Sequence, residues 1–257
     1  LYKMKFTDVL TATDNNPLYY KFVPIFIKTW KKLFPEIKIH IILISEQMIH
    51  ELEPYSEYIK LFPPLKDVKS SFIAQNIRLL YPCLLETEGG VLITDMDIVP
   101  MNRDYYVKSI ENIDNDKFVC YRQLECVGKN EMVICYNIAL PKIWKQIFSI
   151  NTLGDINYTL QNILNNNIKY VGHSDMPFWI TDQLYLYEST QKWNKTKNNL
   201  VILNDDITKF KRLDRNRFPN HTELVYNIQS GTFSDYHMYR PYDKYKVIND
   251  RIIELLN

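Results

Sequence analysis

The chain has 257 residues, a formal net charge of +1, 46% hydrophobic residues and 24% charged residues. This length can bury one sizeable hydrophobic core, and the composition is that of an ordinary soluble globular protein. The near-zero net charge gives no global electrostatic argument for nucleic-acid binding, and no apolar run approaches the roughly 18–20 residues of a membrane-spanning helix.

The first part of the chain predicts a βαβ unit. Residues 7–13 favour a strand, and residues 14–16 (Asp-Asn-Asn) can cap a helix that begins near Pro17. Pro24 should kink this helix or delay its start, because proline lacks a backbone N–H. The β-branched run Lys38–Ile44 is typical of a fully buried second strand. A strand, a helix and a strand at this spacing predict a parallel sheet.

The end of the first strand is a candidate ligand site. Ligands of open α/β sheets bind at the carboxyl ends of the strands. The residues at that end, which we expect to line a base and ribose pocket, are Thr11, Ala12, Thr13 and Asp14. A plain strand-to-helix cap is the alternative.

A helix, a short strand and another helix are expected next. Residues 46–58 predict a polar helix, and Ile59–Phe62 predicts a short strand. Ser70 or Ser71 can cap the following helix, which Pro82 should divide. The buried stripe of this helix consists of Ile73, Ile77, Leu80 and Leu84, with Arg78 beside it.

Two carboxylates follow that helix after two glycines and a short apolar strand. Because alternate side chains of a strand share a face, Asp95 and Asp97 can converge while Met96 points away. Close carboxylates repel each other unless a cation lies between them, and oxygen ligands suit Mg²⁺ or Mn²⁺ bound together with phosphate. A solvated turn is the alternative. The helix before the glycines should bring Arg78 close to the same place.

The rest of the chain predicts an alternation of short helices and strands. The expected helices cover residues 102–112, 141–150, 155–167 and 247–256. The expected strands cover residues 117–121, 131–139 and 200–203. The apolar residues of these strands predict that a mixed sheet continues across the core.

Residues 75–100 carry a recognisable signature. A helix with Arg78 leads through Pro82 to Gly-Gly-Val at residues 89–91 and to an Asp-x-Asp pair, Asp95 and Asp97. This order resembles the glycosyltransferases with a GT-A fold. The segment from Arg78 to Pro82 resembles the glycogenin-like and lipopolysaccharide galactosyltransferase-like family. The Gly-Gly-Val segment resembles the initiating mannosyltransferase and capsular-sugar transferase family.

The resemblance implies an α/β fold in which a mostly parallel central sheet is flanked by helices, with a smaller mixed sheet beside it. It implies one catalytic domain over residues 1–257, with residues 1–100 as the nucleotide-binding half and residues 101–257 as the acceptor-binding half. It assigns the donor sugar or its phosphates to Arg78 and the metal to Asp95 and Asp97, with Asp95 also on the donor side. Asn137 stands where the family has the strand against which the donor sugar rests, although Ile138-Ala139 replaces the family's Ser-Gly.

Asp182 and Gln183 resemble the Asp-Gln motif of the same family. There the Asp holds sugar hydroxyls and the Gln lies near the anomeric carbon, while inverting relatives use a carboxylate in this region as the general base. A helix-start carboxylate stabilised by the helix dipole is the alternative for Asp182. Phe178 and Trp179 can stack on an acceptor sugar or belong to the core.

Residues 235–242 resemble the carboxyl-terminal His…Lys-Pro-Trp motif of the family. His237 then corresponds to the third metal ligand, and Arg240 to the lysine that holds the diphosphate. His221 is a competing candidate for the metal. The basic residues in 209–217 predict a solvated face or, alternatively, peripheral contact with an anionic or lipid-phosphate acceptor.

The sequence therefore predicts a metal-dependent glycosyltransferase, of the hexosyltransferase kind, that uses Mn²⁺ or Mg²⁺. The expected reaction moves a sugar from a nucleoside diphosphate sugar, with a UDP-sugar as the first candidate, to an acceptor hydroxyl on a glycan, glycoprotein or glycolipid. The anomeric configuration of the donor is expected to be retained. A metal-dependent nucleotidyl- or phosphotransferase and a non-catalytic sugar- or nucleotide-binding module are the alternatives. Nucleic acid is not an expected partner.

The cysteines bear on the compartment. Cys83, Cys120, Cys126 and Cys135 lack zinc-site spacing and lie largely in apolar segments, which is typical of buried thiols in a reducing compartment. A cytoplasmic protein is the expectation. Because the chain starts with Leu1, the luminal catalytic domain of a membrane-anchored protein is the alternative.

Overall fold

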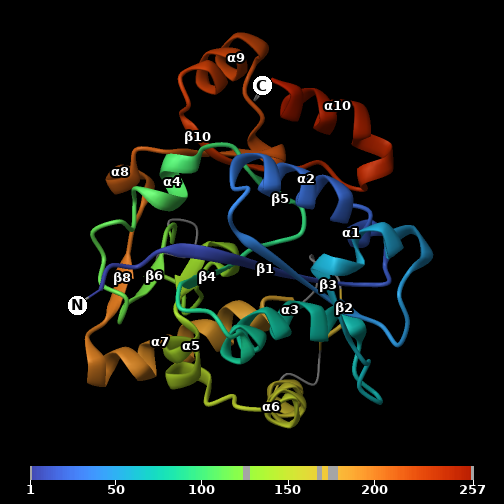
Figure 1. The fold of residues 1–257 in the computed structure, drawn as a ribbon, viewed down its shortest axis with the longest axis vertical. Helices are drawn as coiled ribbons and strands as arrows, with labels where there is room; N and C mark the ends of the chain where they lie inside the picture. The colour runs from blue at the N-terminus through green and yellow to red at the C-terminus, as the bar shows by residue number, and fades with distance from the viewer. Residues whose placement is uncertain (1, 124–127, 167–169, 173–178, 256–257) are drawn as a thin grey trace.

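A seven-stranded sheet forms the centre of the molecule (Figure 1). The computed structural model describes residues 2–123, 128–166, 170–172 and 179–255. The strands lie in the order β3-β2-β1-β4-β7-β6-β8, and β7 runs against the other described strands of the sheet. Their bounds are β1 Phe6–Asp14, β2 Lys38–Ile44, β3 Ile59–Phe62, β4 Gly90–Ile93, β6 Phe118–Cys120, β7 Asn137–Ala139 and β8 Leu200–Ile202.

The predicted βαβ unit is confirmed. β1 and β2 pair in parallel, and the predicted bounds of β2 match the observed ones. Asn16 caps the short helix α1 (Pro17–Tyr20) by accepting the backbone N–H of Leu18. Pro24 lies in the first turn of a separate helix, α2 (Val23–Leu33), so the helix start is delayed as the proline predicted.

Two glycines bring β4 into the sheet between β1 and β7. A Cβ atom on Gly89 would lie 2.1 Å from Thr7 Oγ1, and one on Gly90 would lie 2.8 Å from Ile138 Cδ1. A Cβ on Gly89 would also lie 2.7 Å from Thr7 Cβ, so a side chain there would force β1 to shift, whereas at Gly90 the Ile138 side chain would have to move. β4 then runs parallel to β1, and the chain leaves the carboxyl end of the sheet at Asp95 and Asp97.

A second sheet of three strands lies beside the first. Its order is β5-β10-β9, with β10 antiparallel to β5 and parallel to β9, so this smaller sheet is mixed as expected. In its register, His237 faces Ile98 on one side and Asp214 on the other. The bounds are β5 Ile98–Pro100, β9 Lys211–Asp214 and β10 Phe233–His237. The sequence analysis predicted no strand at any of these positions.

Helices cover both faces of the large sheet (Figure 1). α3, α5, α6 and α7 lie on one face, while α2, α4, the small sheet and the helices α9 and α10 lie on the other. The bounds of the remaining helices are α3 Ser70–Leu80, α4 Arg103–Val107, α5 Pro141–Phe148, α6 Leu153–Asn166, α7 Thr181–Lys197, α8 Asp205–Thr208, α9 His221–Gln229 and α10 Tyr242–Glu254. The 3₁₀ helices are η1 His50–Tyr58, η2 Tyr81–Leu84, η4 Ile134–Tyr136 and η5 Arg215–Arg217.

Several predicted elements need correction. The helix predicted over residues 46–58 is a 3₁₀ helix that begins at His50 and contains Pro54, which removes a donor that an α-helix needs. The strand predicted over residues 131–139 is reduced to β7, because a 3₁₀ turn precedes it. The N-cap position of α3 is Lys69, without a side-chain cap, rather than a serine. Asn167, the predicted end of α6, lies outside the described residues.

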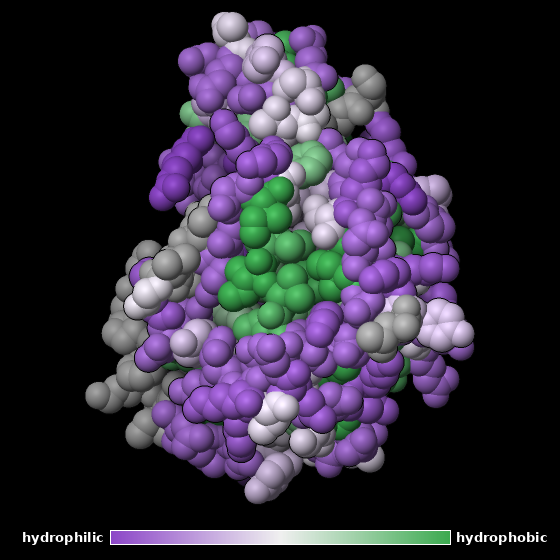
Figure 2. Space-filling view, turned by 90° about the vertical axis from the view of Figure 1, so that its left-hand side faces the viewer, coloured by the Kyte–Doolittle hydropathy of each residue, from purple (hydrophilic) through white to green (hydrophobic). Residues whose placement is uncertain are grey.

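The structure also shows where apolar side chains are exposed and where the cysteines lie. Figure 2 shows apolar side chains gathered on the face that carries β8 and α8, where Ile202 and Ile207 are 39% and 59% exposed. None of the described helices is both long enough and apolar enough to cross a bilayer. Cys83, Cys120 and Cys135 are buried thiols, as predicted, whereas Cys126 lies outside the described residues.

Candidate functional site

A cavity of about 220 Å³ opens at the carboxyl ends of β1 and β4. It collects side chains from α1, α3, α7, η5 and β10 around the segment that follows β4. The predicted site residues that line it are Ala12, Thr13, Asp14, Arg78, Asp95, Asp97, Asp182, Gln183, His237 and Arg240. Residues from both halves of the chain thus meet at one place.

Two predicted donor-binding residues do not line this cavity. Thr11 and Asn137 are both fully buried, with relative exposures of 0%. The Asn137 side chain donates to the backbone carbonyls of Val133 and Ile134 at 2.6 and 3.0 Å. Asn137 therefore stabilises the 3₁₀ turn before β7. Thr11 lies within the buried part of β1, and the residues that follow it, Ala12, Thr13 and Asp14, line the cavity.

Arg78 joins two carboxylates at one end of the cavity. Its guanidinium donates to Asp95 through Nη1 and to Asp182 through Nη2, the second bond at 3.1 Å. The side chain of Arg78 is only 8% exposed. α3 supplies Arg78, whereas α7 supplies Asp182 and the segment after β4 supplies Asp95, so this contact also ties three parts of the chain together.

Asp182 is the more deeply buried of those carboxylates. Burial raises its pKa to about 6, against the lowering effect of Arg78 and with the help of the nearby charge of Asp95. Its Oδ1 atom accepts the backbone N–H of Gln183 at 2.8 Å, and its Oδ2 atom accepts from Arg78. Both oxygens of Asp182 thus already bind donors of the protein.

Asp97 lies among cationic side chains at the other end of the cavity. Its Oδ2 atom accepts from Arg215 Nη1 at 2.7 Å and lies 3.3 Å from His237 Nε2 and 3.9 Å from Arg240 Nη1. Burial opposes the charge of Asp97, but the attraction of His237, Arg215 and Arg240 outweighs it and holds the pKa of Asp97 far below its ordinary value.

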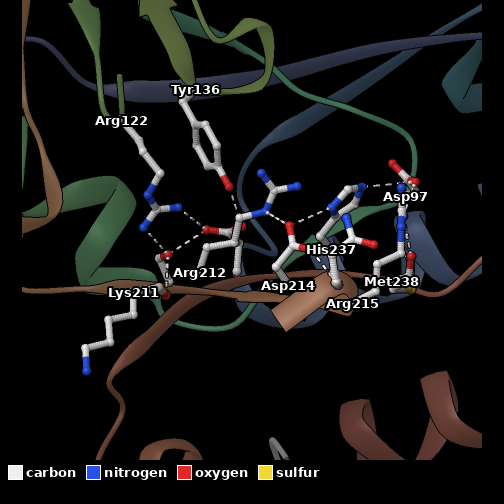
Figure 3. A network of polar contacts seen from close by, with 12 residues as sticks. Asp97, Arg122, Tyr136, Lys211, Arg212, Asp214, Arg215, His237 and Met238 are labelled. Atoms are coloured by element: carbon white, nitrogen blue, oxygen red, sulfur yellow. Dashed lines mark hydrogen bonds and ion pairs between the residues drawn. The ribbon is translucent and has the colours of Figure 1, made fainter. Parts of the chain in front are cut away.

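His237 is oriented by a second carboxylate (Figure 3). Its Nδ1 atom lies 3.0 Å from Asp214 Oδ2 on the neighbouring strand β9, which directs Nε2 towards Asp97 and the cavity. Burial disfavours the charged imidazole, but Asp97 and Asp214 outweigh burial, so the pKa of His237 is raised from its ordinary value. This arrangement is typical of ligand histidines, whose second nitrogen binds a carboxylate.

A buried polar cluster anchors the strand that carries His237 (Figure 3). Asp235 is fully buried and accepts from Arg122 at 3.0 Å and from the Tyr136 hydroxyl at 2.6 Å. Arg122 also donates to Ser234 at 3.1 Å. Because every partner in this cluster is buried, β10 and its terminal histidine are held in one position.

Aromatic side chains form two walls of the cavity. The Tyr19 ring lies against Arg240, 5.5 Å from its Cζ atom, and the Tyr19 hydroxyl accepts from Arg240 at 3.0 Å. Trp179 stacks on Tyr170 with ring centroids 6.2 Å apart, and Gln75 donates to the Trp179 carbonyl at 3.3 Å. Trp179 thus faces the cavity as a supported ring, whereas Phe178 lies outside the described residues.

The donor types suit a divalent cation. Two ligands bound at about 2.1 Å to one octahedral ion lie about 3 Å apart, and Asp97 Oδ2 lies 3.3 Å from His237 Nε2. Asp95 lines the same cavity, whereas His221 does not. Within the described part of the chain, however, no three His, Cys, Asp or Glu side chains stand together as a ready metal site. Arg78 and Arg215 bind the carboxylates instead.

The basic residues in 209–217 do not form one solvated face. Lys209, Lys211 and Arg217 are exposed, but the side chains of Arg212 and Arg215 are only 13% and 11% exposed. Arg212 packs over the Tyr136 ring, and Arg215 lines the cavity. The sequence reading therefore missed Arg215, together with Asp214, Tyr19 and Gln75. No local pattern in β9 and η5 separates the buried basic side chains from the exposed ones.

Comparisons with known proteins agree on the fold. No protein-family model and no curated protein sequence matches this chain. The solved galactosyltransferase LgtC, in complex with donor and acceptor sugar analogs, is 14% identical, with a TM-score of 0.50 over 97% of this chain and 95% of that one. An active-site mutant of LgtC is 15% identical, with a TM-score of 0.51 over the same shares. GlyE from Streptococcus pneumoniae is 14% identical, with a TM-score of 0.47 over 98% of this chain and 60% of that one.

The large sheet, the small mixed sheet and the likeness to LgtC define the class of fold. The chain has the GT-A fold of glycosyltransferases, as the signature in residues 75–100 predicted.

Proposed function

We propose that this protein is a glycosyltransferase that moves a sugar from a nucleoside diphosphate sugar to an acceptor hydroxyl. A UDP-sugar is the first candidate for the donor. The observation that carries the proposal is the composition of one cavity. At the carboxyl ends of parallel strands it combines a carboxylate pair, a histidine and three arginines. These are the groups that a diphosphate and its divalent cation need, at the position where open α/β sheets bind ligands.

The donor nucleotide belongs at the end of β1 in this proposal. Ala12, Thr13 and Asp14 line the cavity there, and Asp14 has its Oδ1 bonded to the backbone N–H of Asn16 at 3.1 Å. The free lone pairs of its carboxylate suit a ribose hydroxyl. Arg78 and Arg240 line the same cavity, where the planar guanidinium group of Arg78 suits the donor sugar or its phosphates and that of Arg240 suits the diphosphate.

Asp95, Asp97 and His237 are the residues that would hold Mn²⁺ or Mg²⁺. Bound there, a divalent cation supplies charge stabilisation to the departing diphosphate. The arginines of the chain add positive charge at the same place, and Arg240 is kept in position by the ring and hydroxyl of Tyr19.

In this proposal Asp182 and Gln183 bind the sugar of the donor. The bond between the anomeric carbon and the diphosphate oxygen breaks, the acceptor oxygen bonds to that carbon, and the acceptor's hydroxyl proton passes to the departing diphosphate oxygen. Because both oxygens of Asp182 already accept hydrogen bonds, this carboxylate suits the binding of sugar hydroxyls better than removal of a proton. That assignment favours a reaction that retains the anomeric configuration of the donor. Trp179 offers a supported ring for the acceptor sugar.

An NMR time course with nucleotide sugars and simple glycans, with and without Mn²⁺, tests the proposal. We expect release of a nucleoside diphosphate and a first-formed product with the donor's anomeric configuration. Asp97→Asn should abolish turnover, whereas Asp206→Asn, an exposed carboxylate, should not. Release of pyrophosphate would instead identify a nucleotidyltransferase, and an inverted product would contradict retention. Donor binding without transfer or hydrolysis would indicate a binding module.

A further inference from the structure

Arg215 binds the carboxylate that the proposed cation needs. Its Nη1 atom donates to Asp97 Oδ2 at 2.7 Å and to the carbonyl of Met238 at 2.5 Å (Figure 3). Arg215 is the first residue of η5, directly after β9, and its side chain is 11% exposed. An arginine and a divalent cation compete for one carboxylate oxygen, because they repel each other.

Arg215 also has donor atoms that Asp97 and Met238 do not use. The hydrogen bonds that the structure describes for this guanidinium both start from Nη1, so Nε and Nη2 have no partner among the described residues. The side chain lines the same cavity as Arg78 and Arg240. A guanidinium group binds phosphate oxygens in a two-pronged manner, which makes a diphosphate a competing partner for Arg215.

We propose that Arg215 exchanges partners: it neutralises Asp97 until a diphosphate enters the cavity, and it then binds the phosphates and releases Asp97 to the divalent cation. This inference rests on the proposed function, and it adds a residue and an order of events to it. It makes cation and diphosphate binding cooperative beyond their direct attraction, because each favours the same displacement of one side chain.

Isothermal titration calorimetry with Mn²⁺ alone, with pyrophosphate alone and with both tests this exchange. In Arg215→Ala we expect Mn²⁺ alone to bind about tenfold more tightly than in the wild type, because Asp97 has lost its competitor. Pyrophosphate alone should bind about tenfold more weakly, because a charged donor is missing. The cooperativity between the two ligands should fall.

Arg217→Ala is the matched control. Arg217 lies in the same 3₁₀ helix, two residues further on, but its side chain is exposed. We expect this variant to bind both ligands as the wild type does. Arg215→Lys keeps a positive charge but lacks the planar fork, so pyrophosphate binding should fall while Mn²⁺ binding stays close to wild type. This variant also provides the test if the alanine variant does not fold.

Different results overturn different claims. If the wild type binds neither nucleoside diphosphates nor pyrophosphate, the proposed function fails. If the wild type binds them and Arg215→Ala binds both ligands with unchanged affinity, the proposed function stands and the exchange by Arg215 is wrong. Weaker binding of Mn²⁺ alone in Arg215→Ala would contradict the exchange in the same way.

Discussion

One end of the cavity holds a single cation, Arg78, between the carboxylates Asp95 and Asp182, and the other end holds a single carboxylate, Asp97, among cationic groups. The first end therefore has an excess of negative charge and the second an excess of positive charge. A carboxylate-rich end suits neutral sugar hydroxyls, which donate hydrogen bonds. A cation-rich end suits phosphates. Under the proposed function, the contrast divides one cavity into a sugar side at Arg78 and Asp182 and a phosphate side at Asp97, with Asp95 bound to Arg78 but also assigned to the cation.

The largest effect is expected from removing the shared cation of the sugar side. Arg78→Ala leaves two carboxylates, one of them buried, without their common partner, and we expect a loss of about 3–5 kcal/mol in the free energy of unfolding. Urea unfolding measures it. The control is Lys108→Ala, which breaks an exposed pair with Asp104 and should change the free energy of unfolding far less. Equal losses in both variants would show that Arg78 does not hold the sugar side together.

The second effect is a pH dependence on the same side. The folded-state pKa of Asp182 is raised to about 6 from 3.8, so its stabilising contribution is present at acidic pH and is lost as the pH rises through about 6. Relative to Asp182→Asn, the wild type should lose roughly 3 kcal/mol in the free energy of unfolding between pH 4 and pH 7. Urea titrations of both proteins across that range give the difference. A difference that stays constant with pH would mean that Asp182 titrates normally.

A third effect concerns the orientation of His237 on the phosphate side. Asp214→Asn removes the carboxylate that binds Nδ1, and we expect Mn²⁺ affinity in the presence of a nucleoside diphosphate to fall by about tenfold. Nucleoside diphosphate binding without Mn²⁺ should change little. Calorimetry of the Asp206→Asn control should match the wild type. Unchanged Mn²⁺ affinity in Asp214→Asn would remove His237 from the cation site.

The smallest effect is expected from Tyr19→Phe. This change keeps the ring against Arg240 but deletes the hydroxyl that accepts its hydrogen bond. We expect nucleoside diphosphate affinity to fall by about three- to tenfold, as for the loss of one ordinary hydrogen bond, because the ring still holds Arg240. Nucleoside monophosphates bind the phosphate side less, so the loss should be smaller for them. A larger loss for monophosphates would place Arg240 away from the diphosphate.

The two sides also differ in how far the sequence predicted them. β1, β2 and β4 are apolar or β-branched runs, so their local patterns give the strands, and the strand ends then give Asp14, Asp95 and Asp97. The helix of Arg78 and the start of α7 follow from periodicity in the same way. The sugar side was therefore expected in outline from local sequence.

Apart from Asp97, and from His237 and Arg240, which the family resemblance assigned, the phosphate side depends on contacts that no local pattern encodes. β9 and β10 contain Lys211, Arg212, Ser234 and Asp235, residues that a short sequence window assigns to a loop. They form strands because β10 pairs with β5, more than a hundred residues earlier, and because Arg122 and Tyr136 satisfy the buried Asp235. Arg215 was read as part of a solvated run for the same reason: its partner Asp97 lies far away in the sequence.

Thermal unfolding of the wild type against nucleoside mono- and diphosphates and their sugars, with and without Mn²⁺, tests the central claim most directly. Ligand at a hundred times its dissociation constant stabilises the folded state by about 2.7 kcal/mol, so modest affinity registers. We expect one nucleoside diphosphate and its sugars to raise the unfolding temperature, more strongly with Mn²⁺, and Asp97→Ala to lose the Mn²⁺ dependence. A well-folded sample that responds to none of these ligands would contradict the assignment of this cavity to a nucleotide sugar.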